Sequence, residues 1–272
     1  MSTHRLDFAK KTWFSPDSRI FLGEGLFETI RVHQKRPCYP LLHWQRMHQG
    51  ALLLGIPFDL SCDMWCEQLA QCIYDAQLCD GGIKVILSGG QAPRGLDSHG
   101  ETSSLLVEPF TYSHHQQALS LVSAPWQRDA NNPIYQIKSV NYLESILARR
   151  QALARGADDA LFFNLQHHAT ETTVANLFII KHNQLYTPKL EHGVLAGITR
   201  GRILNLCKTA GIHCEEASLD SSTIAEADAI FVTNALQGTR FVKSFDGRFV
   251  PIKHPLVSQL RRLLSTDGVC WG

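Results

Sequence analysis

A lysine and a glutamate, separated by one expected helix and one expected strand, are the residues of this chain best placed for chemistry. Lys138 stands at the mouth of the helix expected over 140–155, and Glu171 follows the strand expected over 160–164. An unprotonated lysine amine can hold the aldehyde of a cofactor, and a carboxylate beside the cofactor's ring can tune its electronics. We therefore interpret Lys138 as the residue that carries an aldehyde cofactor and Glu171 as the acid that tunes its ring.

Three further segments could hold an anion. The glycine-lined stretch 193–202 leads into a helix for which Thr199 is a good N-cap candidate, and a helix start of this kind suits a phosphate group. Arg46 lies on the helix expected over 41–54, where an arginine is more often a solvated surface residue. Arg94 lies in the breaker-rich loop 89–96, where it is either a carboxylate ligand or an ordinary surface arginine.

Composition excludes several classes of function. The chain has 272 residues, 44% of them hydrophobic, with 26 basic and 25 acidic side chains and a formal net charge of +1. This balance gives no reason to expect nucleic-acid binding, and no window is apolar enough to span a membrane. The eight cysteines form no CxxC pair, so we expect reduced thiols and no metal site. The polar start at 1–7 lacks an apolar signal core, from which we expect a cytoplasmic protein.

The expected elements mix strands and helices in two groups. The first group contains strands over 27–33, 83–88 and 103–108, with helices over 41–54 and 62–78 between the first two strands, and the second contains strands and helices from 118 onward. Gly23 and Gly25 precede a strand and not a helix, so they do not form a dinucleotide-binding motif. We expect an N-terminal α/β domain over 1–110, a polar connection over 111–118 and a C-terminal domain over 119–272.

Together these segments resemble the class IV, fold-type IV pyridoxal-phosphate enzymes. The resemblance covers the chain from about Gly23 to about Val250, and it is carried by Lys138-Ser-Val-Asn-Tyr, by 170–178, and by Gly197-Ile198-Thr199-Arg200. It implies a two-domain α/β (α+β) fold, pyridoxal 5'-phosphate as cofactor, a small-molecule substrate and a homodimer. On matching positions it implies that Lys138 carries the cofactor and Glu171 contacts the pyridine nitrogen. The implied phosphate ligands are Arg46, Ile198, Thr199, and the Asn234-Ala235 loop through its backbone.

Two positions are closest to the 4-amino-4-deoxychorismate lyases of that family. Thr29, in Phe27-Glu28-Thr29-Ile30, matches a threonine that those lyases use in proton transfer, where branched-chain aminotransferases commonly carry glycine. Asn234-Ala235-Leu236 resembles the lyase form of its loop, and Arg94 is similar to an arginine that binds substrate carboxylate. The implied reaction converts aminodeoxychorismate to 4-aminobenzoate and pyruvate, a step of folate biosynthesis.

The sequence leaves two alternatives open. One is an aminotransferase on the same scaffold that acts on branched-chain or D-amino acids, and the other is a non-catalytic relative. Two segments depart from the family pattern: 164–169 replaces a common Asp-x-x-Gly turn, and Tyr142 stands where some lyases have another residue. The role of Tyr142 stays open between cofactor contact and packing.

Overall fold

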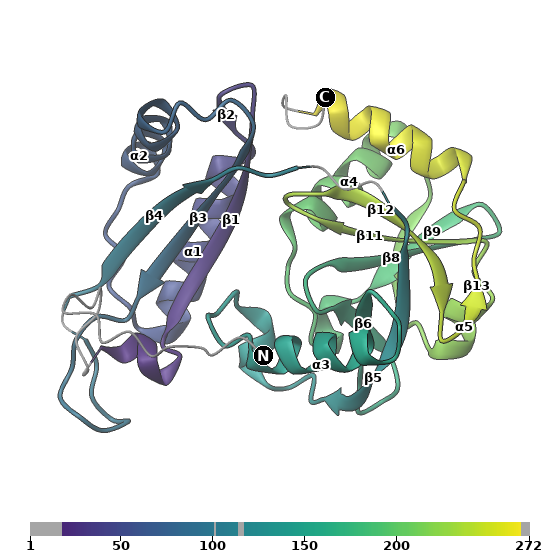
Figure 1. Cartoon of the computed structure of the whole chain (residues 1–272), viewed down its shortest axis with the longest axis horizontal. Coiled ribbons are helices and arrows are strands. Elements are labelled where there is room, and N and C mark those ends of the chain that lie inside the picture. Colours follow the sequence, from purple (N-terminus) through teal and green to yellow (C-terminus); the bar gives the residue numbers. More distant parts are fainter. Residues whose placement is uncertain (1–17, 101, 114–116, 268–272) are drawn as a thin grey trace, which may run out of the picture.

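The computed structural model describes residues 18–100, 102–113 and 117–267, and within them the chain forms two sheets with helices around each (Figure 1). The first is a four-stranded sheet of order β2-β1-β3-β4, and α1 and α2 cover one of its faces. The bounds of these elements are η1 Arg19–Leu22, β1 Gly25–His33, β2 Arg36–Pro37, α1 Pro40–Leu54, α2 Cys62–Asp75, β3 Gly81–Ser88 and β4 Ser104–Phe110.

The second sheet has nine strands and closes on itself. Its order is β10-β9-β8-β11-β12-β5-β6-β7, and β7 pairs back with β8 through Glu171 and Asn176, so the strands from β8 round to β7 form a barrel. The bounds are β5 Leu119–Arg128, η2 Pro133–Gln136, α3 Leu143–Ala154, β6 Asp159–Asn164, β7 Ala169–Thr172, β8 Asn176–Lys181, β9 Gln184–Pro188, η3 Leu190–His192, α4 Ile198–Ala210, β10 Cys214–Ala217, α5 Ser221–Ala225, β11 Ala229–Asn234, β12 Gly238–Phe245, β13 Arg248–Phe249 and α6 Pro255–Thr266.

Alternation along the barrel strands sorts the core into layers. Leu161 and Leu177 point into the barrel, while their neighbours Phe162 and Phe178 point outward. The outward residues of β6 pack against α3, and those of β8 and β11 pack in the cluster that contains residues of α4 and α6. The barrel therefore fixes the positions of α3, which follows Lys138, and of α4, which begins at Ile198.

The segment before α3 joins the two sheets. The Phe27 amide donates to the Lys138 carbonyl at 2.9 Å, and the Val140 amide donates to the Gly25 carbonyl at 3.0 Å. Gly25 suits this pairing because a Cβ there would lie 2.9 Å from the Leu87 carbonyl oxygen. Lys138 therefore belongs to an extended segment held against β1.

The predicted elements are confirmed, with three differences at helix ends. The helix predicted over 140–155 begins at Leu143, because the preceding residues form the extended pairing with β1. The second helix ends at Asp75, before the predicted 78. The prediction that Thr199 is an N-cap is wrong: Gly197 occupies that position without a side-chain cap, and Thr199 is buried inside the first turn.

The mixed α/β fold class is also as predicted, while the domain limits remain a prediction. β4 ends at Phe110 and β5 begins at Leu119, so the predicted connection over 111–118 lies between the two sheets. Residues 114–116 of that connection, the N-terminal residues 1–7 and Cys270 lie outside the described residues.

Three features concern the described part of the chain as a whole: membrane-spanning helices, clusters of metal-ligating side chains, and the state of the cysteines. In the described part of the chain no helix is long and apolar enough to cross a membrane, and no cluster of three or more metal-ligating side chains occurs. The cysteines of that part carry free thiols.

Two leucines at β6 should differ in how much their side chains contribute to the free energy of unfolding. Leu161 is fully buried inside the barrel, whereas Leu165, just beyond the strand, is 54% exposed. Leu161→Ala should lower the free energy of unfolding by about 2–5 kcal/mol, because it removes buried contacts and leaves a cavity. Leu165→Ala should change it by under about 0.5 kcal/mol. Urea unfolding of the cofactor-free proteins measures both, and equal effects would contradict the barrel core described above.

Candidate active site

A cavity of about 550 Å³ lies where the two sheets meet. This volume is within the roughly 300–1,000 Å³ typical of small-molecule sites. It is lined by eight of the predicted site residues, which come from segments far apart in the sequence: Thr29, Arg46, Lys138, Glu171, Ile198, Thr199, Asn234 and Ala235. The structure therefore brings these residues together, and their individual roles remain predictions.

Lys138 lies between two aromatic rings at the cavity wall. Its Nζ is 3.0 Å from the Tyr142 hydroxyl, to which it donates, and 4.2 Å from the centre of the Phe27 ring. Burial and the Arg46 guanidinium lower the pKa of Lys138 to about 8, against the attraction of Glu28 and Glu171. The unprotonated amine is therefore much more populated near neutral pH than in a solvated lysine.

Tyr142 is the nearest polar neighbour of that amine. Burial and the nearby Glu171 carboxylate raise the pKa of the Tyr142 hydroxyl to about 12. The hydroxyl therefore stays protonated near neutral pH and can donate a hydrogen bond into the cavity. Tyr142 also lines the cavity, and its role stays open between contact with a bound molecule and packing.

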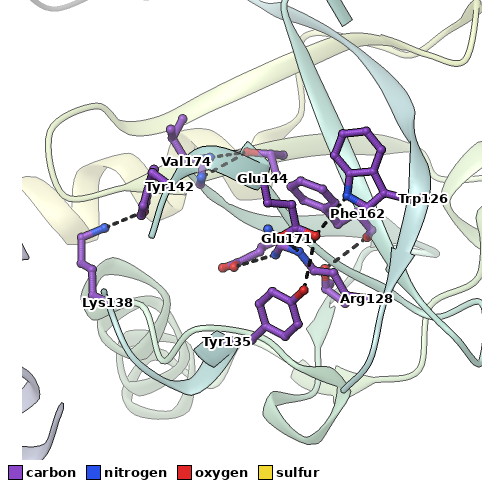
Figure 2. A network of polar contacts seen from close by, with 12 residues as sticks. Trp126, Arg128, Tyr135, Lys138, Tyr142, Glu144, Phe162, Glu171 and Val174 are labelled. Carbon is purple, nitrogen blue, oxygen red and sulfur yellow. Dashed lines mark hydrogen bonds and ion pairs between the residues drawn. The ribbon is translucent and has the colours of Figure 1, made fainter. Parts of the chain in front are cut away.

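Glu171 is held by an arginine that the sequence gave no reason to select. Arg128 Nη1 donates to Glu171 Oε1 at 3.1 Å, and Arg128 Nε donates to Glu144 Oε2 at 2.9 Å, as Figure 2 shows. The Arg128 guanidinium also lies 3.5 Å from the centre of the Phe162 ring. Burial raises the pKa of Glu171, while Arg128 and Lys138 oppose this rise. Arg128 therefore favours the ionised form of Glu171 and fixes its direction.

Arg46 depends on a second carboxylate that sequence reasoning also missed. Arg46 donates to both oxygens of Glu28, from Nε at 2.8 Å and from Nη2 at 2.6 Å, and Glu28 also contacts His43 Nδ1 at 2.6 Å. Burial alone would raise the pKa of Glu28, but Arg46 and His43 lower it to about 2. The third nitrogen, Nη1, donates to the Ala196 carbonyl at 3.2 Å, next to the start of α4. Alternation in β1 was the available signal, because it turns Glu28 toward the helix layer.

The start of α4 faces the cavity without a side-chain cap. Gly197 is its N-cap residue, and Ile198 and Thr199 line the cavity in the first turn. The first amides of a helix lack partners within the helix and attract anions. Gly197 fits closely against the buried Asn176, since a Cβ on Gly197 would lie 2.1 Å from Asn176 Oδ1. Asn176 itself donates to the Thr233 carbonyl at 2.8 Å, which ties the helix start to β11.

The loop after β11 is organised by Asn234. Its Oδ1 accepts from the amides of Leu236 and Gln237, at 3.1 and 2.9 Å, and its Nδ2 donates to the Val174 carbonyl at 3.4 Å. The side chain thus shapes the turn that carries Ala235 and Leu236 along the cavity. Phosphate binding through the backbone N–H groups of this loop stays a prediction.

Arg94 is the one predicted site residue that is not in the cavity lining. Its loop is attached to η1 at the outer edge of the first sheet: the Arg19 amide donates to the Gly90 carbonyl at 2.8 Å, and Arg19 Nη1 donates to the Gly95 carbonyl at 2.7 Å. Arg94 is exposed there. These bonds fix the position of the loop, and substrate binding by Arg94 stays a prediction.

The buried Glu28–Arg46 pair predicts a large effect of removing one charge. Glu28→Gln should lower the free energy of unfolding by roughly 3 kcal/mol above pH 4.5, because Arg46 then lacks its counter-charge. The pKa of Glu28 is lower in the folded chain than its ordinary value of 4.5, so wild type loses this contribution as the pH falls from 4.5 toward about 2. The two proteins should therefore converge in stability at low pH.

A matched control is the exposed pair of Glu226 and Lys181, whose charged atoms are 2.9 Å apart. Solvent screens such a pair, so Glu226→Gln should leave the unfolding midpoint unchanged within error. Urea titrations at a series of pH values measure both variants. A Glu28→Gln protein as stable as wild type at pH 7 would contradict the role given to this pair.

Comparison with known proteins identifies the family. The family model described as Amino-transferase class IV matches residues 25–245. The crystal structure of a Legionella pneumophila protein, provisionally named 4-amino-4-deoxychorismate lyase, is 51% identical, covers 95% of this chain and 96% of its own, and superposes with a TM-score of 0.93. Aminodeoxychorismate lyase from Vibrio harveyi is 27% identical, with 91% of this chain and 92% of its own covered. The Escherichia coli K12 branched-chain-amino-acid aminotransferase is 26% identical, over 84% of this chain and 78% of its own.

The described residues fit the cofactor of this family. Solved structures that share the fold contain pyridoxal phosphate or pyridoxamine phosphate. Here an amine of lowered pKa, an oriented carboxylate, and an uncapped helix start beside Arg46 face one cavity, and they match the aldehyde, ring nitrogen and phosphate of that cofactor. The chain belongs to the class IV aminotransferase family, and its cofactor is pyridoxal 5'-phosphate.

Proposed function

We propose that this chain is a 4-amino-4-deoxychorismate lyase, which converts aminodeoxychorismate to 4-aminobenzoate and pyruvate. The observation that carries the proposal is the position of Thr29. This threonine lines the cavity two residues beyond Phe27, whose ring contacts the Lys138 amine. Its hydroxyl therefore faces the same space as the amine. The similarity to the Legionella and Vibrio proteins supports the same assignment.

We propose that three groups of residues bind the cofactor. The phosphate would lie against Arg46, the amides at Ile198 and Thr199, and the turn shaped by Asn234 with Ala235. Glu171 would hold the proton of the ring nitrogen, since Arg128 favours the ionised form of this carboxylate and fixes its direction. Lys138 would hold the aldehyde end.

The chemistry would divide between the cofactor and two side chains. Pyridoxal phosphate supplies a ring that accepts the electron pair released when a neighbouring C–H bond breaks. Lys138 Nζ, displaced from the aldehyde by the 4-amino group of the substrate, would remove the proton from the ring carbon that bears this group. Thr29 Oγ1 or Lys138 would then donate a proton to the enolpyruvyl group as its oxygen leaves the adjacent carbon, so that the group is released as pyruvate. Aromatisation of the remaining ring favours the products.

An aminotransferase is the alternative on the same scaffold. The branched-chain aminotransferase of Escherichia coli has a chain that matches over 84% of this one. Such an enzyme would also use Lys138 and Glu171, but it would need an amino acceptor and would have no use for the Thr29 hydroxyl. The two functions therefore differ in the second substrate and in their dependence on Thr29.

We also propose that the enzyme is a homodimer. The outer face of α3 exposes large apolar side chains, which are Leu143, Ile146, Leu147 and Leu153. Exposed apolar patches of this kind commonly mark contact surfaces between chains. Leu143 also lines the cavity, so this face continues from the active site.

A first prediction concerns the proposed phosphate site. Gly197→Ala should weaken pyridoxal-phosphate binding about tenfold or more, because its Cβ displaces Asn176 and with it the start of α4. Gly201→Ala, one turn later on the same helix, is the matched control, since a Cβ there has no atom within 4 Å. It should bind the cofactor as wild type does and be slightly more stable. Fluorescence titration of the cofactor-free proteins measures both affinities.

A second prediction follows from the lowered pKa of Lys138. The rate at which cofactor-free protein captures pyridoxal phosphate should rise with pH and level off above about pH 8, because only the unprotonated amine reacts. Stopped-flow absorbance at a series of pH values measures it. A rate that keeps rising toward pH 10.5, the ordinary lysine pKa, would show that the site does not depress the pKa of this amine.

A third prediction tests the proposed reaction through Thr29. Thr29→Ser should retain most of the lyase turnover, whereas Thr29→Gly should lose about 100-fold, in the range of general acid–base catalysis. Transamination of branched-chain and D-amino acids, assayed in parallel, should stay negligible in all three proteins. A Thr29→Gly variant with undiminished lyase turnover would remove Thr29 from the mechanism. Rapid transamination by wild type that Thr29→Gly retains would favour the aminotransferase.

A further inference from the structure

Glu144 is a carboxylate of the cavity lining that the proposed chemistry does not use. It lies in the first turn of α3, where the helix dipole alone favours an acid. Its carboxylate is nevertheless bound by three side chains of the cavity wall, as Figure 2 shows. Trp126 Nε1 and the Tyr135 hydroxyl donate to Oε1 at 3.0 and 3.3 Å, and Arg128 Nε donates to Oε2 at 2.9 Å. These contacts indicate a role for Glu144 beyond starting the helix.

Arg128 joins Glu144 to Glu171. Its Nη1 donates to Glu171 Oε1 at 3.1 Å, so that one guanidinium bridges two carboxylates. Only 4% of the Arg128 side chain is exposed, against 28% for Glu144 and 17% for Glu171. The centres of the Phe162 and Tyr135 rings lie 3.5 and 4.6 Å from the central carbon of the guanidinium, and they fix its position. The three charged groups therefore interact where solvent screens them only partly.

The charges of these three side chains leave a net negative charge at the place proposed for the ring nitrogen. Glu144 and Glu171 are negative and Arg128 is positive. A protonated ring nitrogen adds one positive charge, which makes the group neutral as a whole. Without Glu144 the same group would carry a net positive charge, and burial disfavours a charge that is not compensated. Glu144 therefore balances Arg128 and leaves the charge of Glu171 for the ring nitrogen.

The other cations of the cavity cannot supply this balance. Burial raises the pKa of Glu171, and Arg128 and Lys138 oppose that rise, so both cations also disfavour a further positive charge beside Glu171. Lys138 would be joined to the aldehyde of the cofactor, and Arg46 has its own counter-charge at the proposed phosphate end. Glu144 is the carboxylate that offsets the cation bound to Glu171.

We propose that Glu144 is a positioning residue that keeps the ring nitrogen of the cofactor protonated by offsetting the charge of Arg128. This inference rests on the proposed contact between Glu171 and that nitrogen, and it applies equally to a lyase and to an aminotransferase. A protonated ring accepts an electron pair better than a neutral one. Because Glu144 acts through Arg128 and Glu171, its loss should slow the chemical step and leave substrate binding nearly unchanged.

The experiment observes the ring nitrogen directly, by nitrogen NMR of holoenzymes loaded with pyridoxal phosphate that is isotope-labelled at this atom. Glu144→Gln should shift the signal at neutral pH toward that of unprotonated pyridine, because the amide carries no charge. A double variant that combines Glu144→Gln with Arg128→Gln removes one charge of each sign, so it should return the signal toward the wild-type position. In turnover, Glu144→Gln should lower kcat about tenfold and change KM less than about threefold.

Trp126→Phe is the matched control. It removes a neutral hydrogen bond to Glu144 and keeps the charge of the carboxylate, so its nitrogen signal should match that of wild type. An unchanged signal in Glu144→Gln, or an equal shift in Trp126→Phe, would overturn the role of Glu144, because its charge would then not be what matters. If Glu144→Gln does not retain the cofactor, the double variant decides: a protonated nitrogen supports the charge balance, and an unprotonated one contradicts it.

Glu171→Gln tests separately the contact on which the inference rests. If this variant leaves the nitrogen signal unchanged, Glu171 does not contact the ring nitrogen, and the role of Glu144 fails with it. If Glu171→Gln shifts the signal and Glu144→Gln does not, the contact stands and only the role of Glu144 is overturned. Product formation by wild type is a different measurement, and it decides the lyase function whichever of these results is found.

Discussion

The pairing of the Lys138 segment with β1 is the interaction on which the rest of the site depends. Two backbone hydrogen bonds, between Phe27 and Lys138 and between Val140 and Gly25, join the first sheet to the segment before α3. Phe27 and Thr29 are thereby placed beside the Lys138 amine, although more than a hundred residues separate them in sequence. The cavity exists because these two surfaces are held face to face. Backbone bonds of this kind are independent of side-chain identity, so they can be kept while the lining residues change function.

Electrostatic pairing then sets the properties of each cavity group. Two arginines face the site, and each is bound by a carboxylate: Arg46 by Glu28, and Arg128 by Glu171 and Glu144. Glu28 fixes Arg46 toward the start of α4, whereas Arg128 fixes the direction of Glu171 and opposes the rise in its pKa that burial causes. Lys138 has no carboxylate in direct contact among its described partners, and burial with the nearby Arg46 lowers its pKa to about 8. Charged side chains thus give Arg46 as a cation of fixed position, Glu171 as a carboxyl group of fixed direction, and Lys138 as an amine that readily loses its proton.

The sequence was sufficient for most of the elements and for eight residues of the cavity lining. Local periodicity located the strands and helices, and the spacing of Lys138, Glu171 and the glycine-lined helix start identified the family that the comparisons confirm. The groups that hold the site residues were not found, because Glu28 and Arg128 act through partners 18 and 43 residues away. The N-cap prediction at Thr199 was wrong because Gly197, which fits against Asn176, is the N-cap residue, and Thr199 is buried in the first turn. The role of Arg94 stays a prediction, because its loop is positioned by hydrogen bonds to η1 that no local pattern reveals.

Product formation by the purified holoenzyme is the most direct test of the central claim. Aminodeoxychorismate is supplied without any amino acceptor, and 4-aminobenzoate and pyruvate are followed together over many turnovers. A lyase that uses Lys138, Glu171 and Thr29 as described releases the two products in equal amounts and continues to turn over. If neither product forms while the cofactor absorbance is intact, and added keto acids restore turnover with amino acids, the chain is an aminotransferase and the lyase account is wrong.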